Sequence, residues 1–245
     1  MREIISELFS FAPISEEPPK KKAYLDIGLF FCLLITLAVT WWFYEFNRNL
    51  ARDSFSLTHI EWLGVTAAMY GLALVPLALV LPIERFAFKT KLLPALGLNP
   101  RPNAVKGKLV YIAPIFIVNL IVFAVRYLLR KSGQITPMAF LFQIPANLLV
   151  VSCEEVMFRG YIQGVLVRRF GDVPGILAAA VLFLAVHLPV RLLLQYENVV
   201  QLTYSLATTL AGGVVFGVAA RKDRCIYGSA ALHFSFNIFY YITLM

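Results

Sequence analysis

The stretch MAFLFQIPANLLVVSCEEVMFRGYIQGVLV, residues 138–167, decides the fold class of this chain. Its first half is almost entirely apolar, and the whole stretch exceeds the roughly 20 residues that a helix needs to cross a hydrocarbon core. Its second half nevertheless contains Glu154, Glu155 and Arg159. Ionisable side chains inside a membrane segment are costly and mark a functional site by default. The stretch therefore predicts a membrane helix that carries a site.

The composition of the whole chain supports a membrane protein. Of its 245 residues, 60% are hydrophobic and only 15% are charged, and the mean hydropathy is +0.75. Soluble domains average about 45–50% apolar and about 25% charged residues. This composition excludes a water-soluble domain, a disordered chain and a fibrous repeat. The three cysteines are too few and too scattered to form a disulfide framework.

The apolar runs predict an all-α, polytopic membrane protein with about seven transmembrane helices. In lipid the backbone must satisfy its own hydrogen bonds, so each run is expected to be a helix. We expect three parts: a cytoplasmic tail or interfacial helix (1–23), N-terminal transmembrane helices with a cytoplasmic loop (24–137), and a catalytic four-helix core (138–245). The predicted spans are 25–43, 62–81, 109–129, 138–167, 173–190, 201–220 and 226–245.

The basic residues predict the orientation in the membrane. Fifteen of the 22 Lys and Arg residues fall on the side of the N-terminal tail and six on the other side. The positive-inside rule then places the N-terminus in the cytoplasm and the C-terminus outside. The net charge of +8 is thus explained by topology, and no nucleic-acid motif accompanies it. We expect a multi-pass protein, in the cell membrane if the organism is prokaryotic, with membrane lipid and not nucleic acid as a partner.

Helical spacing separates the roles of the two glutamates. Glu155 and Arg159 are four residues apart with the acid first, the favourable order for an ion pair on one helix face. Glu154 lies about 100° around the helix and projects elsewhere. Under the alternative interpretation, the helix ends at Val151 and these charges lie in the cytoplasmic interface.

Two of the three histidines fall inside apolar segments, which favours a site within the membrane. His187 and His233 occupy different spans, and Asn237 follows His233 at the same-face spacing of four residues. Glu154 lies 17 residues before the predicted turn at Gly171, and His187 lies 16 after it. In an antiparallel hairpin both lie roughly 24–26 Å from the turn. These polar groups can therefore share one layer.

Two chemistries suit such a cluster, and both hydrolyse an amide. Glu154, His187 and His233 would bind a divalent metal such as zinc with an open position for water. Alternatively, a glutamate and a histidine activate water directly, while His233 and Asn237 donate to the oxyanion. The usual zinc-peptidase motif, the serine elbow and the phosphate loop are all absent from the sequence. Cys153 is a poor nucleophile because a buried thiol beside carboxylates stays protonated.

Three motifs resemble a known family. Glu154-Glu155-x-x-x-Arg159, Phe183-x-x-x-His187 and His233-x-x-x-Asn237 are similar, in order and in separate helices, to those of the CAAX-protease and bacteriocin-processing family. These are intramembrane proteases related to the Ras-converting CAAX prenyl endopeptidase. The resemblance covers roughly residues 138–245, and the N-terminal spans match no family.

The resemblance implies a role for each motif residue. Glu154 would activate water with His187 as its partner, and Glu155 and Arg159 would orient the site. The last motif would provide oxyanion donors, or a metal ligand at His233. The family resemblance points to metalloproteases, and a direct glutamate mechanism has also been proposed for it, so the cofactor stays open.

The resemblance implies an intramembrane endopeptidase that cleaves a membrane-associated or lipidated peptide or protein. Two alternatives of other classes remain at this point. One is a non-catalytic immunity or scaffold protein of the same fold, since a fold does not determine a function. The other is a small transporter that uses the carboxylates as a proton relay. The absence of an inverted repeat disfavours the transporter.

Overall fold

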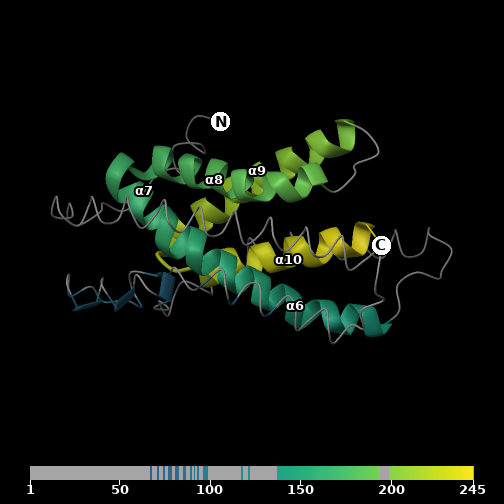
Figure 1. Cartoon of the computed structure of the whole chain (residues 1–245), viewed down its shortest axis with the longest axis horizontal. Helices are drawn as coiled ribbons and strands as arrows, with labels where there is room; N and C mark the ends of the chain where they lie inside the picture. The colour runs from purple at the N-terminus through teal and green to yellow at the C-terminus, as the bar shows by residue number, and fades with distance from the viewer. Residues whose placement is uncertain are drawn as a thin grey trace.

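A computed structural model describes residues 137–193 and 199–244, isolated positions between 67 and 98, and positions 117 and 121. These residues contain helices and no strand, which confirms the all-helical prediction for this part of the chain. Figure 1 shows the helices running roughly along one direction. In chain order they are α6 (Pro137–Glu155), η1 (Val156–Ile162), α7 (Gln163–Phe170), α8 (Asp172–Leu193), α9 (Val199–Asp223) and α10 (Tyr227–Leu244).

The last four predicted spans are confirmed as helices, and their limits agree within a few residues. The tail 1–23 and the spans 25–43, 62–81 and 109–129 lie outside the described residues except for isolated positions. Of the described helices, α9 is the one long and apolar enough to cross a membrane, and Asp172–Leu188 is a shorter apolar helical stretch. The total of seven spans and the orientation therefore stay predictions.

The fourth predicted span is a continuous helical rod with a widened middle. Between α6 and α7 the segment η1 is a π-helix, and at its end the N–H of Gln163 donates to the carbonyl of Phe158, five residues earlier. Such wide turns are rare, and they occur frequently at functional sites. This one follows directly after Glu155, at the point where the motif begins.

A tight turn at Gly171 reverses the chain between α7 and α8. Gly171 has a φ of 87°, which a glycine adopts without a Cβ penalty, and its N–H donates to the carbonyl of Val167. The hairpin predicted around this residue is confirmed. Further along, Gly213 and Gly217 on α9 approach Ala180 and Ile176 on α8, and the missing side chains let the two helices pack closely.

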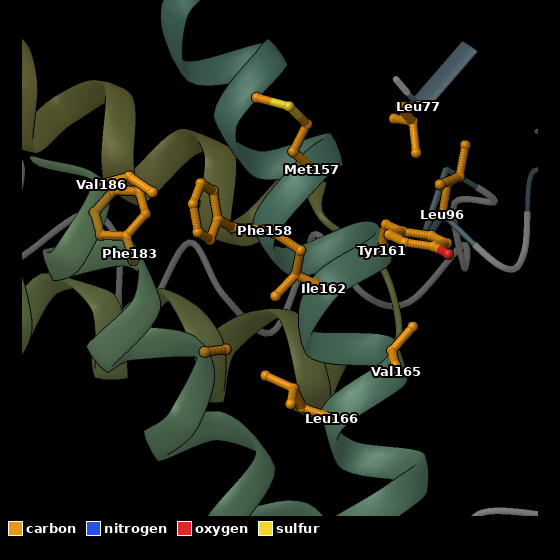
Figure 2. Packing of buried hydrophobic residues seen from close by; sticks show 11 residues of the cluster. Leu77, Leu96, Met157, Phe158, Tyr161, Ile162, Val165, Leu166, Phe183 and Val186 are labelled. Carbon is orange, nitrogen blue, oxygen red and sulfur yellow. The ribbon is translucent and has the colours of Figure 1, made fainter. Parts of the chain in front are cut away.

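The apolar core lies around η1. Phe158 and Ile162 are fully buried, and Phe158 points toward Phe183 on α8 (Figure 2). On the other side of η1, Tyr161 packs beside Leu96 from the N-terminal half of the chain (Figure 2). The polar motif of η1 is therefore enclosed by apolar contacts on two sides.

The close approach of α7 and α8 predicts that Gly175→Ala destabilises the protein. A Cβ at Gly175 would lie 2.6 Å from the backbone of Val167, so one helix must shift. Overpacking of this kind costs about 1–3 kcal/mol. Gly164→Ala is the matched control, because its Cβ would meet only the flexible end of Arg168 at 3.4 Å. Thermal unfolding in detergent should show a lower midpoint for Gly175→Ala alone; equal midpoints would contradict this packing.

Candidate active site

The carboxylate of Glu154 lies between two imidazoles from other helices. Its Oε1 is 3.7 Å from Nε2 of His187 on α8, and its Oε2 is 3.7 Å from Nε2 of His233 on α10. The Glu154 side chain is 6% exposed, and the two imidazoles are 13% and 5% exposed. Three separate helices therefore bring one acid and two bases into a largely buried cluster.

The hydrogen bonds of the two imidazoles determine which nitrogen faces Glu154. Nδ1 of His187 lies 2.7 Å from the carbonyl oxygen of Phe183, and a carbonyl only accepts, so this nitrogen carries the hydrogen. Nδ1 of His233 donates in the same way to Oε1 of Glu155 at 2.9 Å. In the neutral form of both rings, Nε2 therefore carries the lone pair of the ring and faces the Glu154 carboxylate.

Glu155, the last residue of α6, connects this helix to α10 from inside the core. Its side chain is 0% exposed. Oε1 accepts from His233, and Oε2 accepts from the hydroxyl of Ser229 at 2.6 Å. The expected ion pair with Arg159 is present, with Nε 3.8 Å from Oε1. A buried carboxylate with these partners orients the His233 ring and offsets the charge of Arg159.

Arg159 is a cation enclosed by aromatic rings. Its side chain is 0% exposed, and its Cζ lies 4.8 Å from the ring centre of Phe183 and 5.9 Å from that of Phe216. Within the described structure, none of its three side-chain nitrogens has a hydrogen-bond partner. The ion pair with Glu155 and the two aromatic faces are thus the contacts that hold the guanidinium.

The same aromatic rings also position the imidazoles. The Phe183 ring lies 4.4 Å from His187 and 5.7 Å from His233, measured between ring centres. Phe216 stacks on His233 with centres 4.6 Å apart and an interplanar angle of 20°. Phe158 supports Phe183 edge-on at 5.0 Å. Both histidine rings are thus fixed by a hydrogen bond on one nitrogen and by an aromatic contact.

The structure brings together five of the six residues that the sequence singled out, all except Asn237. That residue lies one turn beyond His233 on α10 and is half-buried, but within the described residues no hydrogen bond or ion pair reaches its amide. Sequence reasoning missed Ser229 and Phe216. Ser229 could have been found by its position four residues before His233, whereas the sequence around Phe216 gives no signal.

The donor set has the chemistry that zinc accepts. It offers one carboxylate and two imidazole Nε2 atoms whose Nδ1 atoms are held by other partners. As the side chains stand, however, no three His, Cys, Asp or Glu residues of the described ranges form a group that would hold a metal ion. A metal at Glu154, His187 and His233 therefore stays a prediction, and no chemical step below passes through one.

The partners of Glu155 predict a large effect of its removal on stability. Glu155→Ala would leave Arg159 and His233 buried without their carboxylate, and breaking a buried pair in this way costs about 3–5 kcal/mol. Ser229→Ala removes one hydrogen bond to the carboxylate and should cost about 1–3 kcal/mol. Thermal unfolding in detergent should rank the wild type, Ser229→Ala and Glu155→Ala in descending order. An unchanged midpoint for Glu155→Ala would contradict the anchoring role.

Comparison with known proteins gives one family. Residues 136–239 match the model of the Rce1-like family, described as type II CAAX prenyl endopeptidase Rce1-like. Neither the curated proteins nor the solved structures contain a match to the chain. The matched segment covers α6 to most of α10, and so includes every residue of the cluster around Glu154. The part of the chain that carries this cluster is therefore similar to the Rce1-like family of type II CAAX prenyl endopeptidases, whose members are membrane-embedded.

Proposed function

We propose that this protein is an intramembrane endopeptidase that hydrolyses a peptide bond in a lipidated or membrane-bound peptide. One observation carries the proposal: the Glu154 carboxylate lies 3.7 Å from the Nε2 atoms of both His187 and His233. Burying an acid and two bases from three helices costs desolvation energy. Side chains that served only to pack the helices together would not incur this cost. The Rce1-like family match points to the same reaction class.

In the proposed reaction Glu154 acts as the general base. Its carboxylate takes one proton from a water molecule, and the resulting hydroxide attacks the carbonyl carbon of the substrate. When the C–N bond breaks, the same proton passes to the leaving amine. The Nε2 lone pair of His187 accepts a hydrogen bond from the water and so orients it beside Glu154.

Glu155 and Arg159 act as positioning residues in this proposal. Glu155 fixes the His233 ring through Nδ1, and the charge of Arg159 balances one of the two buried carboxylates. The predicted role of His233 as an oxyanion donor requires a protonated Nε2, because in the neutral ring this nitrogen accepts. Asn237 would donate its amide from one turn further along α10.

Exposed apolar side chains on the helices around the site also support a membrane-associated substrate. Residues such as Val181 on α8 and Tyr204 on α9 expose large apolar surfaces, as expected of helices in contact with lipid. A lipidated peptide shares that environment, so it would reach the site from the membrane. We further propose the multi-pass arrangement with a cytoplasmic N-terminus, since the basic residues favour it.

The test is cleavage of a fluorogenic peptide that carries a prenylated cysteine near its C-terminus, together with its unprenylated counterpart. Loss of the general base or of its partner should lower kcat by about 10²–10⁴-fold. Glu154→Gln and His187→Gln should therefore be nearly inactive in detergent. Arg169→Gln, an exposed position on α7, is the matched control and should retain full activity. Equal cleavage by the wild type and both site variants would reject the proposal.

A further inference from the structure

Arg159 has more hydrogen-bond donors than the described structure uses. A guanidinium carries five N–H groups, and within the described structure none of the three Arg159 nitrogens has a hydrogen-bond partner although the side chain is 0% exposed. Buried polar groups in folded proteins are nearly always paired, and an unpaired charged donor is especially costly. The guanidinium is therefore expected to bind a small polar ligand that reaches it inside the core.

The π-helical turn changes the direction in which Arg159 projects relative to the two glutamates. In a regular α-helix, five residues correspond to a rotation of about 140°, so Glu154 and Arg159 would point to different sides. A π-helix has hydrogen bonds between residues five apart, which brings residues at that spacing back toward one face. Glu155 pairs with Arg159, and the charge of Glu154 also attracts the guanidinium.

The cluster around Glu154 contains several hydrogen-bond acceptors and one group, the guanidinium of Arg159, with N–H groups that are not used. The carboxylate accepts, and so do the Nε2 atoms of His187 and His233 in their neutral forms. The Nδ1–H groups of both rings and the hydroxyl of Ser229 already donate to other atoms. Among the residues described around this carboxylate, Arg159 has the N–H groups that make no hydrogen bond.

A water molecule fits such surroundings because it donates two hydrogens and accepts in return. Buried waters typically make about three hydrogen bonds to polar groups that would otherwise lack partners. Here the acceptors would be Glu154 and one imidazole, and the donor would be the guanidinium. A second carboxylate is a poorer ligand, since two carboxylates already act on this one cation.

We propose that Arg159 binds the water molecule that hydrolyses the peptide bond. This inference rests on the proposed endopeptidase function. It gives Arg159 a direct contact with the reacting water in addition to its role as a positioning residue. One N–H of Arg159 donates to the water oxygen, while one O–H of the water donates to Glu154. The O–H bond breaks, its proton goes to Glu154, and the oxygen bonds to the carbonyl carbon. The proton then leaves with the amine as the C–N bond breaks.

The charge of Arg159 makes this step easier in the low-polarity core. Negative charge develops first on the water oxygen and then on the tetrahedral intermediate, and a fixed cation nearby stabilises both. Electrostatic attraction is stronger where water is excluded than in bulk solvent. The guanidinium would thus supply the positive charge that a metal ion supplies in a metalloprotease.

The experiment compares kinetics and inhibitor binding of Arg159→Gln, Arg159→Lys and the control Arg169→Gln. Loss of one preorganised donor lowers kcat by about 10²–10³-fold, so Arg159→Gln should show that loss while KM stays within about threefold. Arg159→Lys keeps the charge but loses the planar array of donors. Its kcat should therefore lie between that of the wild type and that of Arg159→Gln. A phosphinate peptide imitates the tetrahedral intermediate, and its affinity should fall in parallel with kcat.

Two further measurements keep the inference testable if the Gln variant does not fold. A high-resolution structure of the wild-type protein should contain an ordered water within hydrogen-bond distance of both Arg159 and Glu154. Activity should also survive complete metal removal. A site without that water, a full kcat in Arg159→Gln, or activity that chelation abolishes and zinc restores would overturn the inference. If Glu154→Gln is inactive while Arg159→Gln is fully active, only this inference fails and the endopeptidase function stands.

Discussion

The buried carboxylate of Glu155 is the contact on which the rest of the site depends. It accepts hydrogen bonds from Ser229 and His233 on α10 and pairs with Arg159 on η1, and it has no contact with solvent. Because these groups are all desolvated, each requires the others, and removing one leaves an unpaired buried charge or dipole. The network joins two helices that are distant in the sequence. It also orients His233 so that Nε2 faces Glu154.

Adjacent glutamates thus have separate tasks because consecutive side chains of an α-helix point about 100° apart. Glu154 faces the imidazoles, whereas Glu155 faces the interior network. Arg159, on the π-helical turn, pairs with Glu155 and is also attracted by the charge of Glu154. Two aromatic rings, those of Phe183 and Phe216, lie beside the guanidinium. In such surroundings small changes of position alter electrostatic energies strongly, which suits a site where charge develops during a reaction.

The sequence was sufficient to predict the helices and the gathering of the motif residues. Apolar run lengths predicted α8 and α10, and counting residues from Gly171 predicted that Glu154 and His187 lie at one depth. The π-helix was not predicted, since the apolar pattern of residues 156–162 is the same for a π-helix as for an α-helix; in the structure this segment packs against Leu96 and α8.

The contributions of Ser229 and Phe216 were not predicted either, although the spacing of four residues between Ser229 and His233 was visible in the sequence. Both look like ordinary residues of an apolar helix, and only the packing of α9 and α10 reveals their contacts with Glu155 and His233. The spacing of His233 and Asn237 predicted that the two side chains share a face of α10. That spacing did not establish a contact. His233 and Ser229 are the α10 residues that bond to Glu155, whereas the amide of Asn237 is not part of this network.

The central claim is that one carboxylate lies between two imidazoles. The most direct test is ¹⁵N NMR of protein labelled at histidine, comparing the wild type with Glu154→Gln. The chain contains only three histidines, so each can be assigned by single substitution. We expect Nδ1–H forms for His187 and His233, and shifts of both Nε2 signals in Glu154→Gln while the signal of His59 stays unchanged. A shift of only one of these signals, or of neither, would contradict it.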